Sequence, residues 1–169
     1  MFEVVKLFLD ICLFKKGPQD IPSSYGLLYV LIVVYALISF LVLFIGAGWF
    51  DAVLQVLVEI ALVIVFTKIM LGLIRKPERY VQTASSLFGT DALISFFALP
   101  GIASMTAGRV TLLAFAVMVG LMIWHWLVTG HIIRHAISQS LSFGLGIALL
   151  YIVAAYQVMA LLFPEAAGT

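Results

Sequence analysis

Five long apolar segments constrain what this chain can fold into. They lie at about 25–47, 52–74, 84–105, 110–132 and 138–162. Each one reaches the roughly 20 residues that an α-helix needs to cross the hydrocarbon core of a bilayer. The chain is 64% hydrophobic and 10% charged, which is far more apolar than a soluble domain. We therefore predict an all-α integral membrane protein with five transmembrane helices in one membrane domain, 1–169.

The third segment, "ASSLFGTDALISFFALPGIASM", is the least regular because it contains Asp91 and Pro100. A broken or re-entrant segment is the alternative to a full span. Lys and Arg number 3, 0, 3, 1, 1 and 0 in the successive segments outside the spans. This alternation favours five full spans, with the N-terminus in the cytoplasm and the C-terminus outside, because basic residues gather on the cytoplasmic side.

The N-terminal residues 2–14 predict a short amphipathic helix on the cytoplasmic surface. Glu3, Lys6 and Asp10 recur at helical spacing on one face, and apolar residues cover the rest. A docking site for a partner helix is the alternative. The segment does not resemble a cleaved signal, because its positive charges follow the apolar stretch.

Two ionisable residues in the spans are predicted to lie at the same depth. Lys68 is eleven residues before Arg79, and Asp91 is twelve after it, so a helical hairpin turning at "RKPERY" places them at similar depth. Because an unpaired charge in hydrocarbon is costly, we predict that they pair or share a polar pocket with His125. This cluster has three interpretations. It fixes the register of the helices, it handles ions, protons or ligands, or it contacts lipid headgroups.

Glu59 is a separate buried carboxyl in the second span. It lies nine residues, or two and a half turns, before Lys68, and so points away from it. Its predicted polar neighbours are Gln55, Gln157, Ser39 and Tyr35. A desolvated carboxyl without a cation is favoured in its neutral form. Glu59, Gln55 and Gln157 are therefore a candidate protonatable site. Three roles for Glu59 stay open. They are a hydrogen-bonded structural role, a protonation switch or transport role, and a position facing lipid.

Small residues around the fifth span predict a helix-packing interface. They form two stripes with a spacing of four: Ala136, Ser140, Gly144 and Ala148, and beside them Ser138, Ser142 and Gly146. Small residues at this spacing let helix backbones approach closely. The contact lies either within the bundle or with a second copy or partner. The third span is also rich in small residues, so we expect these two helices to touch.

The sequence contains no established motif for an enzyme, a cofactor or a metal site. HExxH, GxSxG, Walker and CxxC motifs are all absent from the sequence. His131 and His135 share one helix face, which is weak evidence for a metal. Cys12 stands alone and is expected to act as a small apolar residue. A net charge of +1 gives no reason to expect nucleic acid. We predict no enzyme, no cofactor and no metal site.

Two stretches resemble the Yip1-like membrane proteins, and in particular a bacterial branch of that group. They are "FLDICLFKKGPQDIPSS" before the first span and "RKPERYVQTASSLFGTDALISFFALPG" after the second. The resemblance covers nearly the whole chain and implies a five-span architecture in a bacterial inner membrane, but no established activity. Eukaryotic members are associated with vesicle trafficking and small GTPases through a long soluble N-terminal region. That role does not carry over, because only about 24 residues precede the first span here.

These observations leave two main hypotheses of function. The first is a small polytopic inner-membrane protein that acts by protein or lipid interaction, as an adaptor, scaffold or membrane organiser. Its partners would be membrane lipids and either a membrane protein or further copies of itself. The alternative is a small transporter or channel, as a monomer or homo-oligomer, using Glu59 and the Lys68, Asp91 and His125 cluster. An intramembrane enzyme comes third. A transporter should have Glu59 facing a cavity, and an adaptor should have it sealed in a dry bundle.

Overall fold

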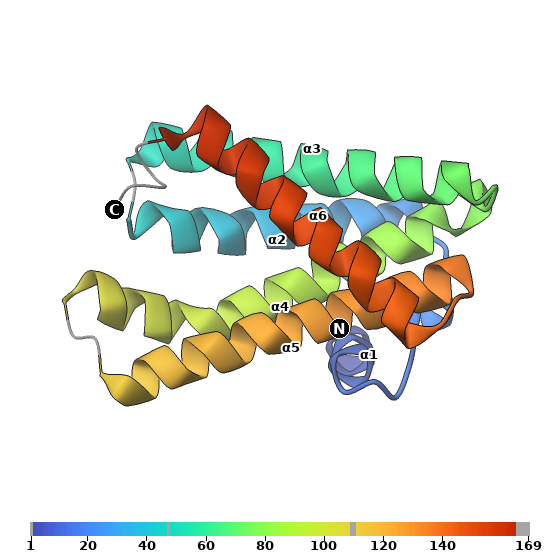
Figure 1. Ribbon diagram of the computed structural model, residues 1–169, viewed down its shortest axis with the longest axis horizontal. Helices are drawn as coiled ribbons and strands as arrows, with labels where there is room; N and C mark the ends of the chain where they lie inside the picture. The colour runs from blue at the N-terminus through green and yellow to red at the C-terminus, as the bar shows by residue number, and fades with distance from the viewer. Residues whose placement is uncertain (1, 47, 109–110, 165–169) are drawn as a thin grey trace.

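Five long helices dominate the computed structural model, which describes residues 2–46, 48–108 and 111–164 (Figure 1). They are α2 Tyr25–Phe44, α3 Trp49–Leu73, α4 Tyr80–Thr106, α5 Leu112–Ile137 and α6 Leu141–Leu162. The described residues contain no strand. All five helices are long and apolar enough to cross a membrane, which confirms the predicted all-α, multi-pass class.

Three short elements complete the chain: α1 Phe2–Cys12, and the 3₁₀ turns η1 Pro18–Asp20 and η2 Pro77–Arg79. The helix predicted over 2–14 ends at Cys12, and Phe14 follows it with a positive φ of 60°. Figure 1 shows α1 nearly end-on, so it runs across the direction of the long helices. Its place at a membrane surface stays a prediction.

The third and fifth spans show how local chemistry sets helix limits. The third is a continuous helix that runs through Pro100, which favours the full span over a re-entrant one. The fifth begins at Leu141 rather than at 138. Ser138 ends α5 in the left-handed region with φ 59°, and the Ser140 hydroxyl then caps α6 by accepting from the Phe143 N–H.

Helix α4 is the centre of the packing and contacts α1, α2, α3 and α5. Its residues from 83 to 90 are all buried. Helix α6 crosses the outside of the bundle, mainly against α5 and to a lesser extent α3 (Figure 1). The expected contact between the third and fifth spans is therefore not a main packing interface, because α5 takes that place beside α4.

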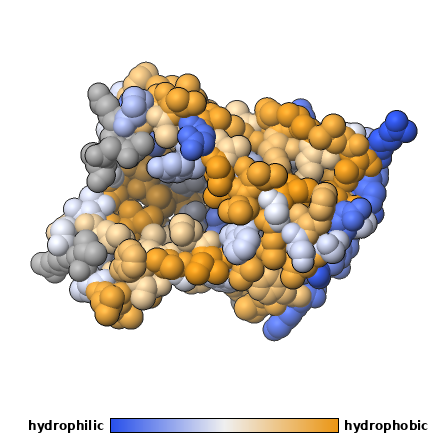
Figure 2. Space-filling model, viewed as in Figure 1, coloured by the Kyte–Doolittle hydropathy of each residue, from blue (hydrophilic) through white to orange (hydrophobic). Residues whose placement is uncertain are grey.

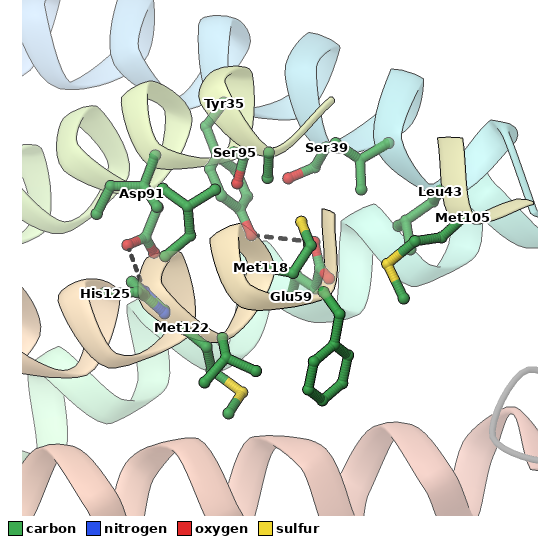
Figure 3. A pocket seen from close by; sticks show the side chains of 16 residues that line it. Tyr35, Ser39, Leu43, Glu59, Asp91, Ser95, Met105, Met118, Met122 and His125 are labelled. Atoms are coloured by element: carbon green, nitrogen blue, oxygen red, sulfur yellow. Dashed lines mark hydrogen bonds and ion pairs between the residues drawn. The ribbon is translucent and has the colours of Figure 1, made fainter. Parts of the chain in front are cut away.

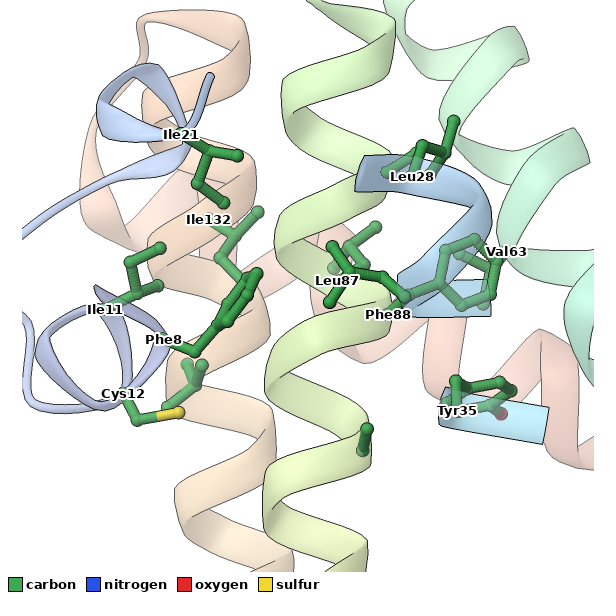
Figure 4. Close-up of a cluster of buried hydrophobic side chains, with 14 of the residues drawn as sticks. Phe8, Ile11, Cys12, Ile21, Leu28, Tyr35, Val63, Leu87, Phe88 and Ile132 are labelled. Carbon is green, nitrogen blue, oxygen red and sulfur yellow. The ribbon is translucent and has the colours of Figure 1, made fainter. Parts of the chain in front are cut away.

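The bundle has two unlike halves. The closed half holds α1, η1, η2 and the turn between α5 and α6. Its core joins α1 to the long helices through Phe8, Ile11, Phe88 and Ile132 (Figure 4). A Cβ atom on Gly89 would overlap the Phe8 ring, so this glycine permits the close approach of α1 to α4. Burial raises the pKa of the Cys12 thiol here to about 12, with a smaller contribution from the charge of Asp91.

The open half holds the C-terminal ends of α2 and α4 and the N-terminal ends of α3 and α5. There the α2–α3 pair lies apart from the α4–α5 pair (Figure 1). The space-filling view shows a hollow at this end and an apolar belt around the middle (Figure 2). Hydrophilic residues gather at the opposite end, in the closed half (Figure 2). Which end faces the cytoplasm stays a prediction.

Candidate functional site: a cavity between two helical hairpins

A cavity of about 700 Å³ lies between the two hairpins. Its polar lining consists of Tyr35, Ser39, Glu59, Asp91, Ser95 and His125. Its apolar lining consists of Val42, Leu43, Ile94, Ala98, Met105, Phe115, Met118, Val119, Leu121 and Met122. The lining runs from the middle of the bundle toward the open half (Figure 3). Among the described residues that form it, none is Lys or Arg.

Helical spacing explains how these side chains reach one space. Tyr35 and Ser39 are one turn apart on the buried face of α2. Asp91 and Ser95 are likewise one turn apart on α4. Residues three or four apart on a helix share a face. Each helix therefore turns a stripe of mixed polarity toward the cavity.

Asp91 and His125 form a close pair at the inner part of the cavity. His125 Nε2 lies 2.9 Å from Asp91 Oδ1, joining α5 to α4 (Figure 3). The Asp91 side chain is 14% exposed and that of His125 is 33% exposed. Since the carboxylate accepts, the imidazole donates from Nε2. The predicted proximity of these two residues is correct.

Lys68 does not join this pair. It is exposed, and its ammonium group lies 5.6 Å from the centre of the Tyr80 ring. The salt bridge between His125 and Asp91 is the only one within the described residues. The predicted pairing of Lys68 with Asp91 was argued from depth alone. In the bundle Asp91 is turned toward α5, whereas the long lysine stem reaches from α3 toward an aromatic ring near the start of α4.

Glu59 lies on α3 and faces the cavity with two hydroxyl partners, those of Tyr35 and Ser39. The Tyr35 hydroxyl donates to Glu59 Oε2 at 3.0 Å, from a buried ring on α2 (Figure 3). Ser39 lines the same space, so both neighbours expected from the first hairpin are present. Gln55 is buried one turn away but does not line the cavity, and Gln157 is exposed. The polar site at Glu59 is thus built by α2 rather than by α6.

The apolar lining is the part of the site that sequence reasoning missed. Met105, Met118, Met122 and Phe115 give the cavity flexible sulfur-containing and aromatic walls. Met118, Met122 and His125 are spaced by four and three residues, so they were recognisable as one face. Nothing in that pattern separates a cavity wall from a face turned to lipid.

The small-residue stripes divide between packing and turn roles. Gly144 meets α5 so closely that a Cβ atom would lie 2.5 Å from the carbonyl oxygen of Gly130. Ala136 and Ala148 are buried at the same contact, so this part of the predicted interface packs within the bundle. Ser138, Ser140, Ser142 and Gly146 are exposed. The Ser138 hydroxyl accepts from Lys76 Nζ at 2.9 Å and from an Arg79 guanidinium nitrogen at 2.8 Å.

The two histidines in the last turns of α5, His131 and His135, contact neighbouring groups of the protein. His131 Nε2 donates to the Lys16 carbonyl at 2.9 Å, which ties the segment after α1 to α5. His135 lies beside it, with ring centres 4.6 Å apart. Within the described residues, no group of three or more His, Cys, Asp or Glu side chains is arranged to hold a metal ion.

No family model, curated protein or solved structure matches this chain. The resemblance to Yip1-like proteins therefore stays a prediction, and the assignment of function depends on the geometry of the cavity.

Proposed function

We propose that this chain is a small multi-pass membrane transporter and that the cavity between its hairpins is the solute site. The observation that carries the proposal is the position of Glu59, which faces a cavity of about 700 Å³ rather than a sealed bundle. This is the arrangement that separates a transporter from an adaptor. Ionisable groups at such depth are costly, and those found within membrane spans commonly mark a substrate, ion or proton pathway.

The two halves of the bundle suggest how a transport cycle would work. The open half gives the cavity its hollow end, and the packed core of the closed half blocks the other end. A cavity that is open at one end and blocked at the other corresponds to one state of an alternating-access cycle. In such a cycle, one helical unit rocks against another around a fixed site. The α2–α3 and α4–α5 pairs are the units whose relative movement would open the closed half.

Cysteine labelling of the cavity tests the proposal directly. Ser95 lines the cavity beyond Asp91 and is replaced by Cys, then exposed in sealed vesicles to a charged thiol reagent from each side. We expect Ser95→Cys to react with reagent added from the side of the open half. The matched control is Ala148→Cys, whose position is fully buried between α5 and α6 and should not react.

Two outcomes of that experiment contradict or extend the proposal. If Ser95→Cys does not react from either side, the cavity is dry and the interaction hypothesis is favoured instead. If it also reacts slowly from the opposite side, the closed half opens, as transport requires. A pH-sensitive dye inside proteoliposomes then reports whether protons move, with Glu59→Gln as the variant expected to lose this movement.

The cellular setting belongs to the same proposal. Hydrophilic residues gather at the closed half, where Arg75, Lys76 and Arg79 follow the second span. By the preference of basic residues for the cytoplasmic side, this supports a cytoplasmic closed half in a bacterial inner membrane. Association with a second copy or a membrane partner, through the exposed Ser142 and Gly146 face, stays a prediction.

A further inference from the structure

We infer that the cavity binds a lipophilic monovalent cation, of the aromatic phosphonium or quaternary ammonium class, in exchange for the proton of Glu59. The inference rests on the proposed transport function and names its class of substrate. It follows from three features of the cavity: its charge, its shape and the partners of Glu59.

The charge of the lining favours a cation. Asp91 and His125 satisfy each other at 2.9 Å. Glu59 accepts from the hydroxyls of Tyr35 and Ser39, which are both neutral, and no Lys or Arg is among the described lining residues. The charge of Asp91 also acts on Glu59, and the two tyrosines on which both carboxyls act, Tyr35 and Tyr151, carry no positive charge. When His125 is protonated and balances Asp91, an ionised Glu59 leaves one negative charge uncompensated in an apolar setting. A proton or a bound monocation would neutralise it.

The walls of the cavity favour an organic cation over a hydrated metal ion. Most of the lining is apolar, and three methionines and Phe115 contribute to it. Methionine side chains adapt to irregular apolar shapes, and aromatic faces attract cations. Among the residues that the structure describes, no group of three or more His, Cys, Asp or Glu side chains is arranged to hold a metal ion.

The volume supports the same class of ligand. At about 700 Å³, the cavity falls inside the range of about 300–1,000 Å³ that accommodates drug-sized molecules. A ligand with several aromatic or alkyl groups around one positive centre would place those groups against Met118 and Met122. Its charge would then lie near the Glu59 carboxylate.

The exchange is balanced in charge and in protons. Glu59 starts as a neutral carboxylic acid that accepts from Tyr35. On binding, the carboxyl loses its proton to solvent and keeps the negative charge, which the incoming cation neutralises. One proton is released for each cation bound. Affinity should therefore weaken as the pH falls, by about tenfold per pH unit once Glu59 is protonated in the free protein.

Equilibrium binding to the purified full chain in detergent tests the inference. The probe is tetraphenylphosphonium, measured at several pH values together with proton release in weak buffer. We expect pH-dependent binding to the unaltered chain. Glu59→Gln should bind at least tenfold more weakly and lose the pH dependence, while Glu59→Asp should keep it. Glu78→Gln is the matched control, because Glu78 is an exposed carboxyl in η2 outside the cavity.

A probe of the same shape and opposite charge separates charge from shape. Tetraphenylborate should not compete for the site. If it binds as well as tetraphenylphosphonium, or if Glu59→Gln binds the cation with unchanged pH dependence, the inference is overturned. Absence of any tetraphenylphosphonium binding also overturns it. In that case reaction of Ser95→Cys with the aqueous reagent would still support a transporter with a different solute, whereas no reaction would remove both proposals.

Discussion

The two halves of α4 meet very different surroundings. From 83 to 90 every residue is buried, and the helix is enclosed by α1, α2 and α5. From Asp91 onward the same helix lines a cavity, and Phe96 and Phe97 are exposed. Small side chains in the first half let neighbours approach from several sides. The second half has larger side chains and no counterpart of α1 to cover it.

Helix α1 makes this difference, because it fills space in the closed half only. The Trp124 indole donates to the Cys12 carbonyl at 2.9 Å, and His131 donates to the Lys16 carbonyl. Both bonds attach the N-terminal segment to α5. One short helix thus seals one end of the bundle and leaves a cavity toward the other end. Changes in the closed half should affect stability, and changes in the cavity should affect binding.

The largest effect on stability is expected from Phe8→Ala. The Phe8 ring is 4% exposed and occupies the space left by Gly89. Removing a buried aromatic ring costs about 3–5 kcal/mol when the cavity does not collapse. Reversible unfolding of the purified protein in mixed micelles measures the loss. Val5→Ala, at a position on α1 that is 51% exposed, is the control and should change stability much less. Equal losses would show that α1 does not seal the closed half.

A smaller effect is expected from breaking the pair in the cavity. His125→Ala leaves Asp91 without its partner, and Asp91→Ala does the reverse. Residues that share a hydrogen bond show coupling energies of about 0.5–3 kcal/mol in double-mutant cycles. We expect a coupling inside that range, since both side chains are partly exposed to the cavity. Additive losses in the double variant would mean that the pair does not stabilise the bundle.

A still smaller effect is expected from Lys68→Met. Its ammonium group lies over the Tyr80 ring from an exposed position, and such contacts contribute about 0.5–1 kcal/mol. The loss should therefore stay below about 1 kcal/mol. A cycle between Lys68→Met and Asp91→Ala should show no coupling. Coupling as strong as that between Asp91 and His125 would instead support the pairing of Lys68 with Asp91 that the sequence predicted.

Lys68 and Glu59 also show how far sequence reasoning reaches in this protein. The number of spans follows from hydropathy and length, and the depth of each charged residue follows from its distance to the helix ends. Depth placed Asp91 beside His125 and Glu59 beside Tyr35 correctly. It does not specify the direction in which a side chain points around the helix. In a sequence this apolar, apolar residues occupy both the faces turned to lipid and those turned to protein, so hydropathy alone does not separate the two.

The cavity itself was not predictable for the same reason. It exists because α1 covers only part of the bundle, and because the two hairpins diverge in the open half (Figure 1). Both are properties of packing between distant segments. The sequence does contain the polar residues of the site, but it contains no signal for the empty volume between them.

The smallest signal is expected from the native thiol in the unaltered protein. Cys12 is fully buried, and its pKa is raised to about 12, so at pH 7–8 the thiol is both protonated and covered. Thiolates are the reactive form, and a maleimide should therefore modify Cys12 only after the protein is unfolded. Mass spectrometry before and after denaturation measures this. Rapid reaction of the folded protein would show that the closed half opens without a solute. Slow reaction of Cys12 on α1 beside fast reaction of Ser95→Cys on α4 would instead show a dry half and a wet half in one molecule.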